Sequence, residues 1–223
     1  AVTIDDFVES MANANDKNFE SFMLWYSQAG TPEVSVEDDY DENNQTYSAT
    51  FTQKNQKTPY MIPNQFGLID KDGEEIESGL IIIDELVKKI SFNNIKSKPI
   101  PSWFRGFSSP IKFSSDLSIQ NKIYLASSDT DPFNRWDSAQ SLWLEYILNP
   151  DQVIEKDLFQ MIKNLINNES DYSLLSEMIS LPSEQIIHQN VGKINVQEVH
   201  NQRNQSILSI ASTFKDELLE LYD

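Results

Sequence analysis

The stretch LWYSQAGTPEVSVEDDYDE, residues 24–42, changes its hydrophobic period at the Gly-Thr-Pro of residues 30–32. Before this point the apolar residues keep helical spacing. After it, Val34, Val36 and Tyr40 alternate as they do on the inward face of a strand. A helix that passes through Gly and Pro into a strand indicates a domain boundary. The segment before the boundary is roughly thirty residues long, which is too short for a domain of its own.

Residues 3–30 are predicted to form two short helices. Thr3 and Asp6 have the spacing of a capping box, and Gly30 is expected to provide a left-handed cap at the end of the second helix. Short helices with bulky aromatic faces need a further surface against which to bury. The apolar positions of the two helices are Ile4, Phe7, Val8 and Met11, followed by Phe19, Phe22, Met23, Trp25 and Tyr26.

Residues 32–116 alternate between apolar and polar positions and contain turn signals at regular intervals, such as DKDG at 70–73. This pattern predicts a β-sandwich of immunoglobulin type. The chain has no cysteine, so the sandwich is expected to be Ig-like in architecture only. Strands are expected near residues 34–36, 47–51, 62–69, 74–78, 80–83, 88–92 and 103–113.

Residues 117–223 return to a period of 3.6 residues. Asp131-Pro132 is a good cap and first-turn pair for a helix that stops at Asn149-Pro150. Helices joined by short connections favour antiparallel pairs in a bundle or solenoid. Further apolar stripes cover 153–166, 174–179 and a final helix from Asn195 through Val199, Ile207, Ile210, Phe214 and Leu218, with a short turn before it that ends near Gly192.

The predicted fold class is therefore multidomain, with α and β parts in sequence. A short helical lead-in covers residues 1–31, an Ig-like antiparallel β-sandwich covers 32–116, and an all-α bundle or solenoid segment covers 117–223. Apolar residues make up 39% of the chain, which is enough for a real core.

The charge of the chain limits its partners. The formal net charge is −18, which opposes binding to nucleic acid or to anionic lipid. The chain contains no cysteine and no apolar stretch long enough to cross a bilayer, and no signal peptide is recognised. We therefore expect a cytoplasmic protein.

Few residues suggest chemistry. His188 and His200 do not begin an H-E-x-x-H zinc helix, and the chain has no third histidine. The acidic run at 37–44 and the DKDG turn both fail as EF-hand loops, which favours a solvated strand end and a turn. We therefore expect no catalytic, metal-binding or cofactor-binding residue in this chain.

The group NRWD at 134–137 is the most distinctive polar stretch. Arg135 and Asp137 have the chemistry to bind a peptide terminus. The interpretation that we prefer is structural: Asp137 is an acid in the first turn that favours the helix dipole, and Arg135 forms a local ion pair.

Two stretches resemble the aminopeptidase N family of zinc-dependent alanyl aminopeptidases, a group of gluzincin metallopeptidases. The segment TIDDFVESM…FMLWYSQAGTPEVSVEDDY is similar to the junction at which the family's catalytic domain passes into a β-sandwich, with a W-x-x-Q-x-G-x-P pattern. The residues in that pattern are Trp25, Gln28, Gly30 and Pro32.

The second stretch, DPFNRWDSAQSLWLEYI at 131–147, is similar to the start of the family's C-terminal helical domain. PIPSWFRGFSSPIKF at 99–113 resembles the end of the sandwich in the family's bacterial branch. The residues that match the helical segment are Arg135, Trp136, Asp137, Ala139 and Gln140.

The resemblance implies that the chain is a non-catalytic fragment: the end of a catalytic domain, the sandwich and the start of the helical domain. Zinc and the catalytic residues would then belong to the parent hydrolase, which removes N-terminal residues from peptides. The sandwich would be a spacer that positions the helical domain over the active site. The alternative is a free-standing binding or adhesion sandwich with a helical appendage.

The expected partners follow from the same resemblance. They are the rest of the parent chain, with peptide substrates for the parent only, and neither nucleic acid nor membrane. We also hypothesise that the chain self-associates through a terminal helix or frays there, because an uncovered apolar stripe forfeits several kcal/mol, at about 1.5–3 kcal/mol for each buried side chain.

Overall fold

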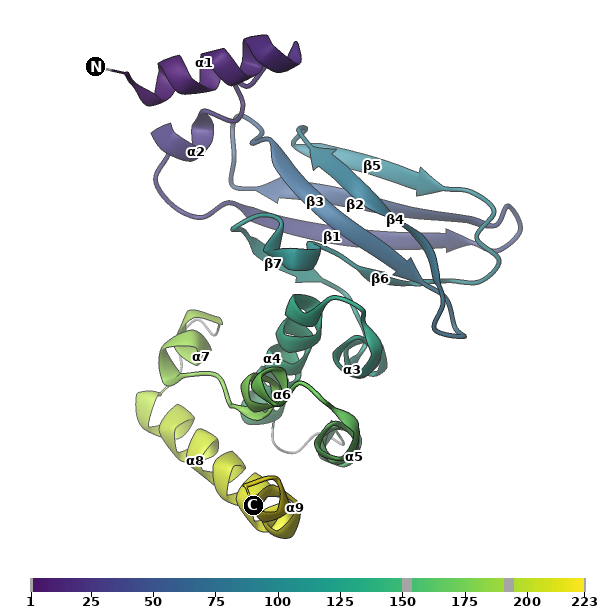
Figure 1. Cartoon of the computed structure of the whole chain (residues 1–223), viewed down its shortest axis with the longest axis vertical. Coiled ribbons are helices and arrows are strands. Elements are labelled where there is room, and N and C mark those ends of the chain that lie inside the picture. Colours follow the sequence, from purple (N-terminus) through teal and green to yellow (C-terminus); the bar gives the residue numbers. More distant parts are fainter. Residues whose placement is uncertain (1, 150–153, 191–194, 223) are drawn as a thin grey trace. The chain divides into compact units, whose positions relative to one another are not determined.

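The computed structural model describes residues 2–149, 154–190 and 195–222 (Figure 1). The chain divides into two compact units, Ala1–Asp116 and Leu117–Asp223. The first contains the lead-in helices and a β-sandwich, and the second is helical, so the predicted fold class is confirmed. Three positions used in the sequence analysis lie outside the described residues: Pro150, Val153 and Gly192.

The first lead-in helix, α1 (Ile4–Asn15), begins with the predicted capping box. The backbone N–H of Asp6 donates to Thr3 Oγ1 at 3.1 Å, and the backbone N–H of Thr3 donates to Asp6 Oδ2 at 2.8 Å. The helix ends at Asp16, whose φ of 49° is left-handed. Local polar groups therefore set both ends of α1.

The second lead-in helix is shorter than predicted. Only α2 (Leu24–Ser27) is α-helical, because the carbonyl of Phe19 accepts from both Phe22 and Met23 and the preceding residues form irregular turns. Gly30 does adopt a positive φ, 101°, but it is not the helix cap that was expected. That cap is Gln28, in an extended conformation.

Two sheets form the sandwich, with strand orders β5-β2-β1-β7 and β4-β3-β6 (Figure 1). The strand pairs are antiparallel except β1 with β7, which is parallel and places Glu33 opposite Lys112. The strands are β1 (Glu33–Asp41), β2 (Thr46–Lys54), β3 (Ile62–Ile69), β4 (Glu75–Ile83), β5 (Val87–Phe92), β6 (Ile100–Ser102) and β7 (Lys112–Ser115).

Alternate residues of both sheets fill the sandwich core. Phe51 of β2 lies edge-on to Trp103 at 5.0 Å between ring centroids, which joins the two sheets. This alternation is what the sequence predicted for an Ig-like sandwich. The fully buried side chains of this core include Val34, Tyr47, Ala49, Phe51, Ile62, Leu68 and Ile83.

Two strand predictions need correction. The segments at 74–78 and 80–83 are one continuous strand, β4. Residues 103–113 are not one strand: the chain forms a short 3-10 turn, η1 (Arg105–Phe107), and only then enters β7. The reason is conformational, because Phe104, Gly106 and Phe107 all have positive φ values and cannot continue a strand.

The second unit contains α3 (Ile119–Ser128), which the sequence analysis did not identify, and α4 (Pro132–Leu148), which begins at the predicted Asp131 cap. The predicted final helix is two helices, because the backbone breaks at Phe214. The remaining helices are α5 (Ile154–Asn168), α6 (Tyr172–Ile179), α7 (Glu184–Asn190), α8 (Val196–Thr213) and α9 (Lys215–Tyr222).

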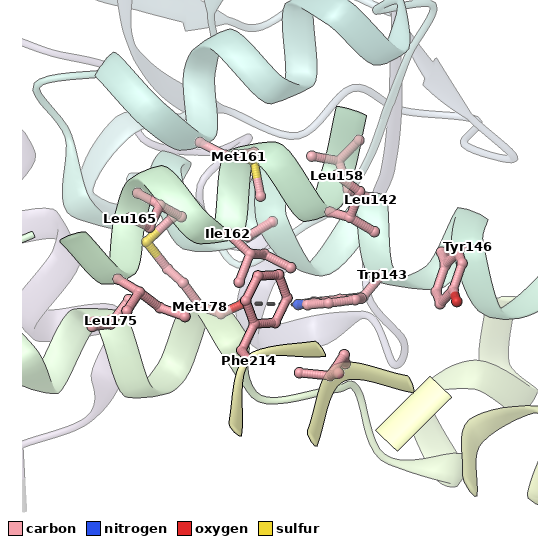
Figure 2. Close-up of a cluster of buried hydrophobic side chains, with 14 residues drawn as sticks. Leu142, Trp143, Tyr146, Leu158, Met161, Ile162, Leu165, Leu175, Met178 and Phe214 are labelled. Carbon is pink, nitrogen blue, oxygen red and sulfur yellow. Dashed lines mark hydrogen bonds between the residues drawn. The ribbon is translucent and has the colours of Figure 1, made fainter. Parts of the chain in front are cut away.

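The core of the helical unit gathers side chains from five of its helices (Figure 2). Trp143 of α4 is fully buried, and its indole N–H donates to the carbonyl of Met178 at 2.8 Å. Phe214 is 2% exposed, so the residue that ends α8 also packs into this core. The labelled members in Figure 2 are Leu142, Trp143, Tyr146, Leu158, Met161, Ile162, Leu165, Leu175, Met178 and Phe214.

Candidate functional site

The first motif forms a connected group that we call the junction cluster: Trp25, Gln28, Gln53 and Tyr60. Trp25 lies edge-on to Tyr60 with ring centroids 5.0 Å apart, and its indole N–H donates to the carbonyl of Met61 at 3.0 Å. The Tyr60 hydroxyl donates to Gln28 Oε1 at 3.1 Å. Two motif residues of the lead-in therefore hold it against the segment that precedes β3.

Gln53 extends the junction cluster into the sandwich. Its side chain is buried, accepts from the backbone N–H of Tyr60 at 2.8 Å and donates to the Tyr60 carbonyl at 2.9 Å. It lies at a further 3.3 Å from the carbonyls of Ile83 and Glu85. The hydrogen-bond partners of this buried amide are all backbone groups. The Gln53 side chain therefore fixes β2, the β2–β3 connection and the end of β4 relative to one another.

The other two residues of the junction motif determine the path of the backbone. Gly30 adopts a φ of 101°, which favours glycine. Pro32 is buried, and its carbonyl accepts from the backbone N–H of Lys112 at 2.9 Å. The motif therefore turns the chain and starts the parallel pairing of β1 with β7.

The second motif lies on α4, where Arg135 joins three helices. Its guanidinium forms an ion pair with Glu169, and its Nε donates to the carbonyl of Ala126 at 3.2 Å. The expected local pair is therefore wrong: the partner lies 34 residues away, after the end of α5. Hydrogen bonds from the backbone N–H of Asp171, with a contribution from Arg135, hold the pKa of Glu169 below its usual range.

Gln140 and Trp143 bind the C-terminal end of α6. The Gln140 amide donates to the carbonyls of Glu177 at 3.2 Å and Ser180 at 2.9 Å, next to the Met178 carbonyl that Trp143 occupies. The last carbonyls of a helix have no partners within it, so these side chains satisfy groups that would otherwise need water. We call Arg135, Gln140, Trp143 and Glu169 the α4 cluster.

The remaining motif residues of α4 do not converge on a cavity. Trp136 is half-buried, packs against the helical core and contacts Phe133 with ring centroids 5.6 Å apart. Asp137 is exposed and is the sixth residue of α4, beyond its first turn, so the expectation of a first-turn acid that favours the helix dipole is wrong. Neither residue joins the α4 cluster.

Arg105 occupies a special position that was not predicted from the sequence. Arg105 is only 7% exposed, pairs with Glu75 and donates from Nε to Ser102 Oγ at 2.9 Å. The hydrogen bond from Arg105 is the main reason that the pKa of Glu75 is lowered. A Cβ on Gly67 would lie 2.2 Å from the guanidinium carbon, so the glycine makes room for this side chain. The signal in the sequence was a glycine inside a strand pattern.

The two histidines lie on helices of the second unit. His200 Nδ1 lies 2.7 Å from Glu184 Oε1, and its Nε2 lies 2.8 Å from Asn204 Nδ2. His188 is half-buried on α7. Within residues 2–149, 154–190 and 195–222, no group of three His, Cys, Asp or Glu side chains is placed to hold a metal ion.

The acidic run at 37–44 is a strand end followed by a turn, as predicted. Asp41 accepts from the backbone and side-chain amides of Asn44, which lowers the pKa of Asp41. Asp38 accepts from the buried Tyr47 hydroxyl at 3.0 Å and pairs with Lys98 at 2.8 Å. Partners within the sandwich therefore account for the carboxylates of Asp38 and Asp41.

A groove of about 400 Å³ lies between α1 and the turns that follow it. Val8, Ala12, Phe19 and Met23 line it together with charged residues such as Glu9. No His or Cys faces it among its lining residues. The groove has the character of an apolar packing surface. In the helices that the structure describes, none combines the length and apolar character needed to cross a membrane.

Two family models match the chain. Residues 30–116 match a domain of unknown function with an Ig-like fold (DUF3458), and residues 119–223 match its C-terminal companion of ARM repeats (DUF3458_C). Together they cover the sandwich and the helical unit.

The sequence is also similar to those of curated aminopeptidase N proteins. Aminopeptidase N of Escherichia coli (strain K12) is 29% identical over 100% of this chain, and aminopeptidase N of Caulobacter vibrioides is 29% identical over 82% of it. The chain spans about 28% of the length of the Escherichia coli protein and 23% of the Caulobacter one.

A solved structure also matches. The crystal structure of Legionella pneumophila aminopeptidase A in complex with aspartic acid superposes with a TM-score of 0.90 at 30% identity, covering 99% of this chain and 27% of the other. The chain is therefore homologous along its whole length to the aminopeptidase N family, over an Ig-like sandwich and an ARM-repeat helical unit.

Proposed function

We propose that this chain is the non-catalytic central and C-terminal part of a zinc-dependent aminopeptidase N, a cytoplasmic enzyme that removes N-terminal residues from peptides. Within it, the chain is a structural spacer that positions the helical domain over the active site. Its partners are the other domains of that protein, and peptide substrates belong to the parent alone.

The observation that carries this proposal is the set of contacts made by the family-motif residues. Trp25 and Gln28 fasten the lead-in to the sandwich, while Arg135 and Gln140 fasten α3, α5 and α6 to α4. These side chains bind backbone carbonyls and other side chains of the same unit. Such contacts make each unit rigid, which is what a spacer requires.

The residues that the structure describes do not fit a catalytic zinc ion. His200 and Glu184 supply two adjacent donors, whereas a catalytic zinc site has three protein ligands. We therefore assign no step of the peptidase reaction to this chain. The zinc ion, which activates the attacking water, belongs in this proposal to the parent's other domain.

The first test is the genomic sequence upstream of the codon for Ala1. An H-E-x-x-H motif in the same reading frame supports the proposal. A stop codon or a signal peptide directly upstream contradicts it and favours a free-standing binding module.

The second test concerns the spacer role. In the protein expressed from the longer reading frame, Arg135→Ala and Gln140→Ala should lower kcat/KM for an alanyl-arylamide while the zinc content stays at one equivalent. Gln160→Ala is the matched control, because Gln160 is exposed and bonds only to Asn164 in its own helix at 3.0 Å. Unchanged activity in both α4-cluster variants would refute a positioning role.

A further inference from the structure

We draw no further inference here: the strongest candidate, the exposed apolar surface patch of Ile4, Phe7 and Met11 along α1, carries none, because nothing in the part of the chain that the structure describes shows what covers it.

Discussion

Replacing Gly67 with alanine tests how the outer face of the sheet β4-β3-β6 is held. A Cβ at this position would lie 2.2 Å from Cζ and Nη1 of Arg105 and 2.4 Å from Nη2. The guanidinium ends a flexible side chain, so it would move rather than the backbone. The movement would break its bonds to Glu75 and to Ser102.

The expected cost follows from those lost bonds. A hydrogen bond to a charged group contributes about 1.5–3 kcal/mol, and breaking a buried ion pair costs about 3–5 kcal/mol. The Glu75 side chain is 36% exposed, which lowers the second figure. We therefore expect Gly67→Ala to reduce the stability of the sandwich by about 2–4 kcal/mol.

The assay must report on the sandwich alone, because the chain has two units and its tryptophans are distributed over both. Hydrogen exchange of peptides covering β3 and β6 meets this requirement. Exchange should be about 30-fold faster or more in Gly67→Ala, since about 1.4 kcal/mol corresponds to a tenfold change.

Gly79→Ala is the matched control on the neighbouring strand. Its new Cβ would lie 3.6 Å from Phe66 Cε1, an ordinary contact, so the variant should be neutral or up to about 1 kcal/mol more stable. Arg105→Met should cost less in the Gly67→Ala background than alone. Equal stability of the two glycine variants, or additive effects of Gly67→Ala and Arg105→Met, would refute the reasoning.

Three further predictions concern the helices and metal content. The pKa of Glu169 is lowered in the fold, so the charge of Glu169 stabilises the fold above about pH 4.3, and this stabilisation is lost as the pH falls further. In the wild-type chain, hydrogen exchange in α4 and α5 should therefore become faster as the pH is lowered through this range. Glu169→Gln should make that pH dependence weaker. The purified chain should retain no stoichiometric zinc after dialysis and should not cleave an alanyl-arylamide; one equivalent by elemental analysis would contradict this. Phe7 and Leu219 are 60% and 54% exposed, so sedimentation at several concentrations should reveal self-association, or hydrogen exchange should reveal fraying of α1 and α9; a strict monomer with both helices protected as well as the sandwich would refute this.

The parts of the fold that follow from local chemistry could be predicted from the sequence. The Thr3 box, the Asp131 cap and the alternation around Val34 and Val36 each depend on residues within one or two turns of one another. Such signals are present in the chain whatever its tertiary context.

What could not be predicted depends on distant partners or on single backbone angles. Glu169, the ion-pair partner of Arg135, lies 34 residues away in the sequence, and no residue near Arg135 indicates this pairing. No Gly or Pro precedes the break between α8 and α9 at Phe214. The apolar stripe is continuous across this break, so the sequence predicted one helix where the structure has two. The apolar stripe of the final predicted helix was also expected to be uncovered. Three of its residues, Val199, Ile210 and Phe214, are instead buried within the helical unit.

The parallel pairing of β1 with β7 has a mechanical consequence. The chain enters the sandwich at Glu33, opposite Lys112, and leaves at Ser115, opposite Val36. Opposed tension on the two ends of the sandwich would therefore pull these strands in shear, loading every bond of the ladder at once. Strands pulled apart from one end would instead release their bonds singly. The carbonyl of Pro32, bonded to Lys112, adds one more bond at the point where the load enters. The sandwich is thus built to transmit a pull between the segments that flank it before its own core opens.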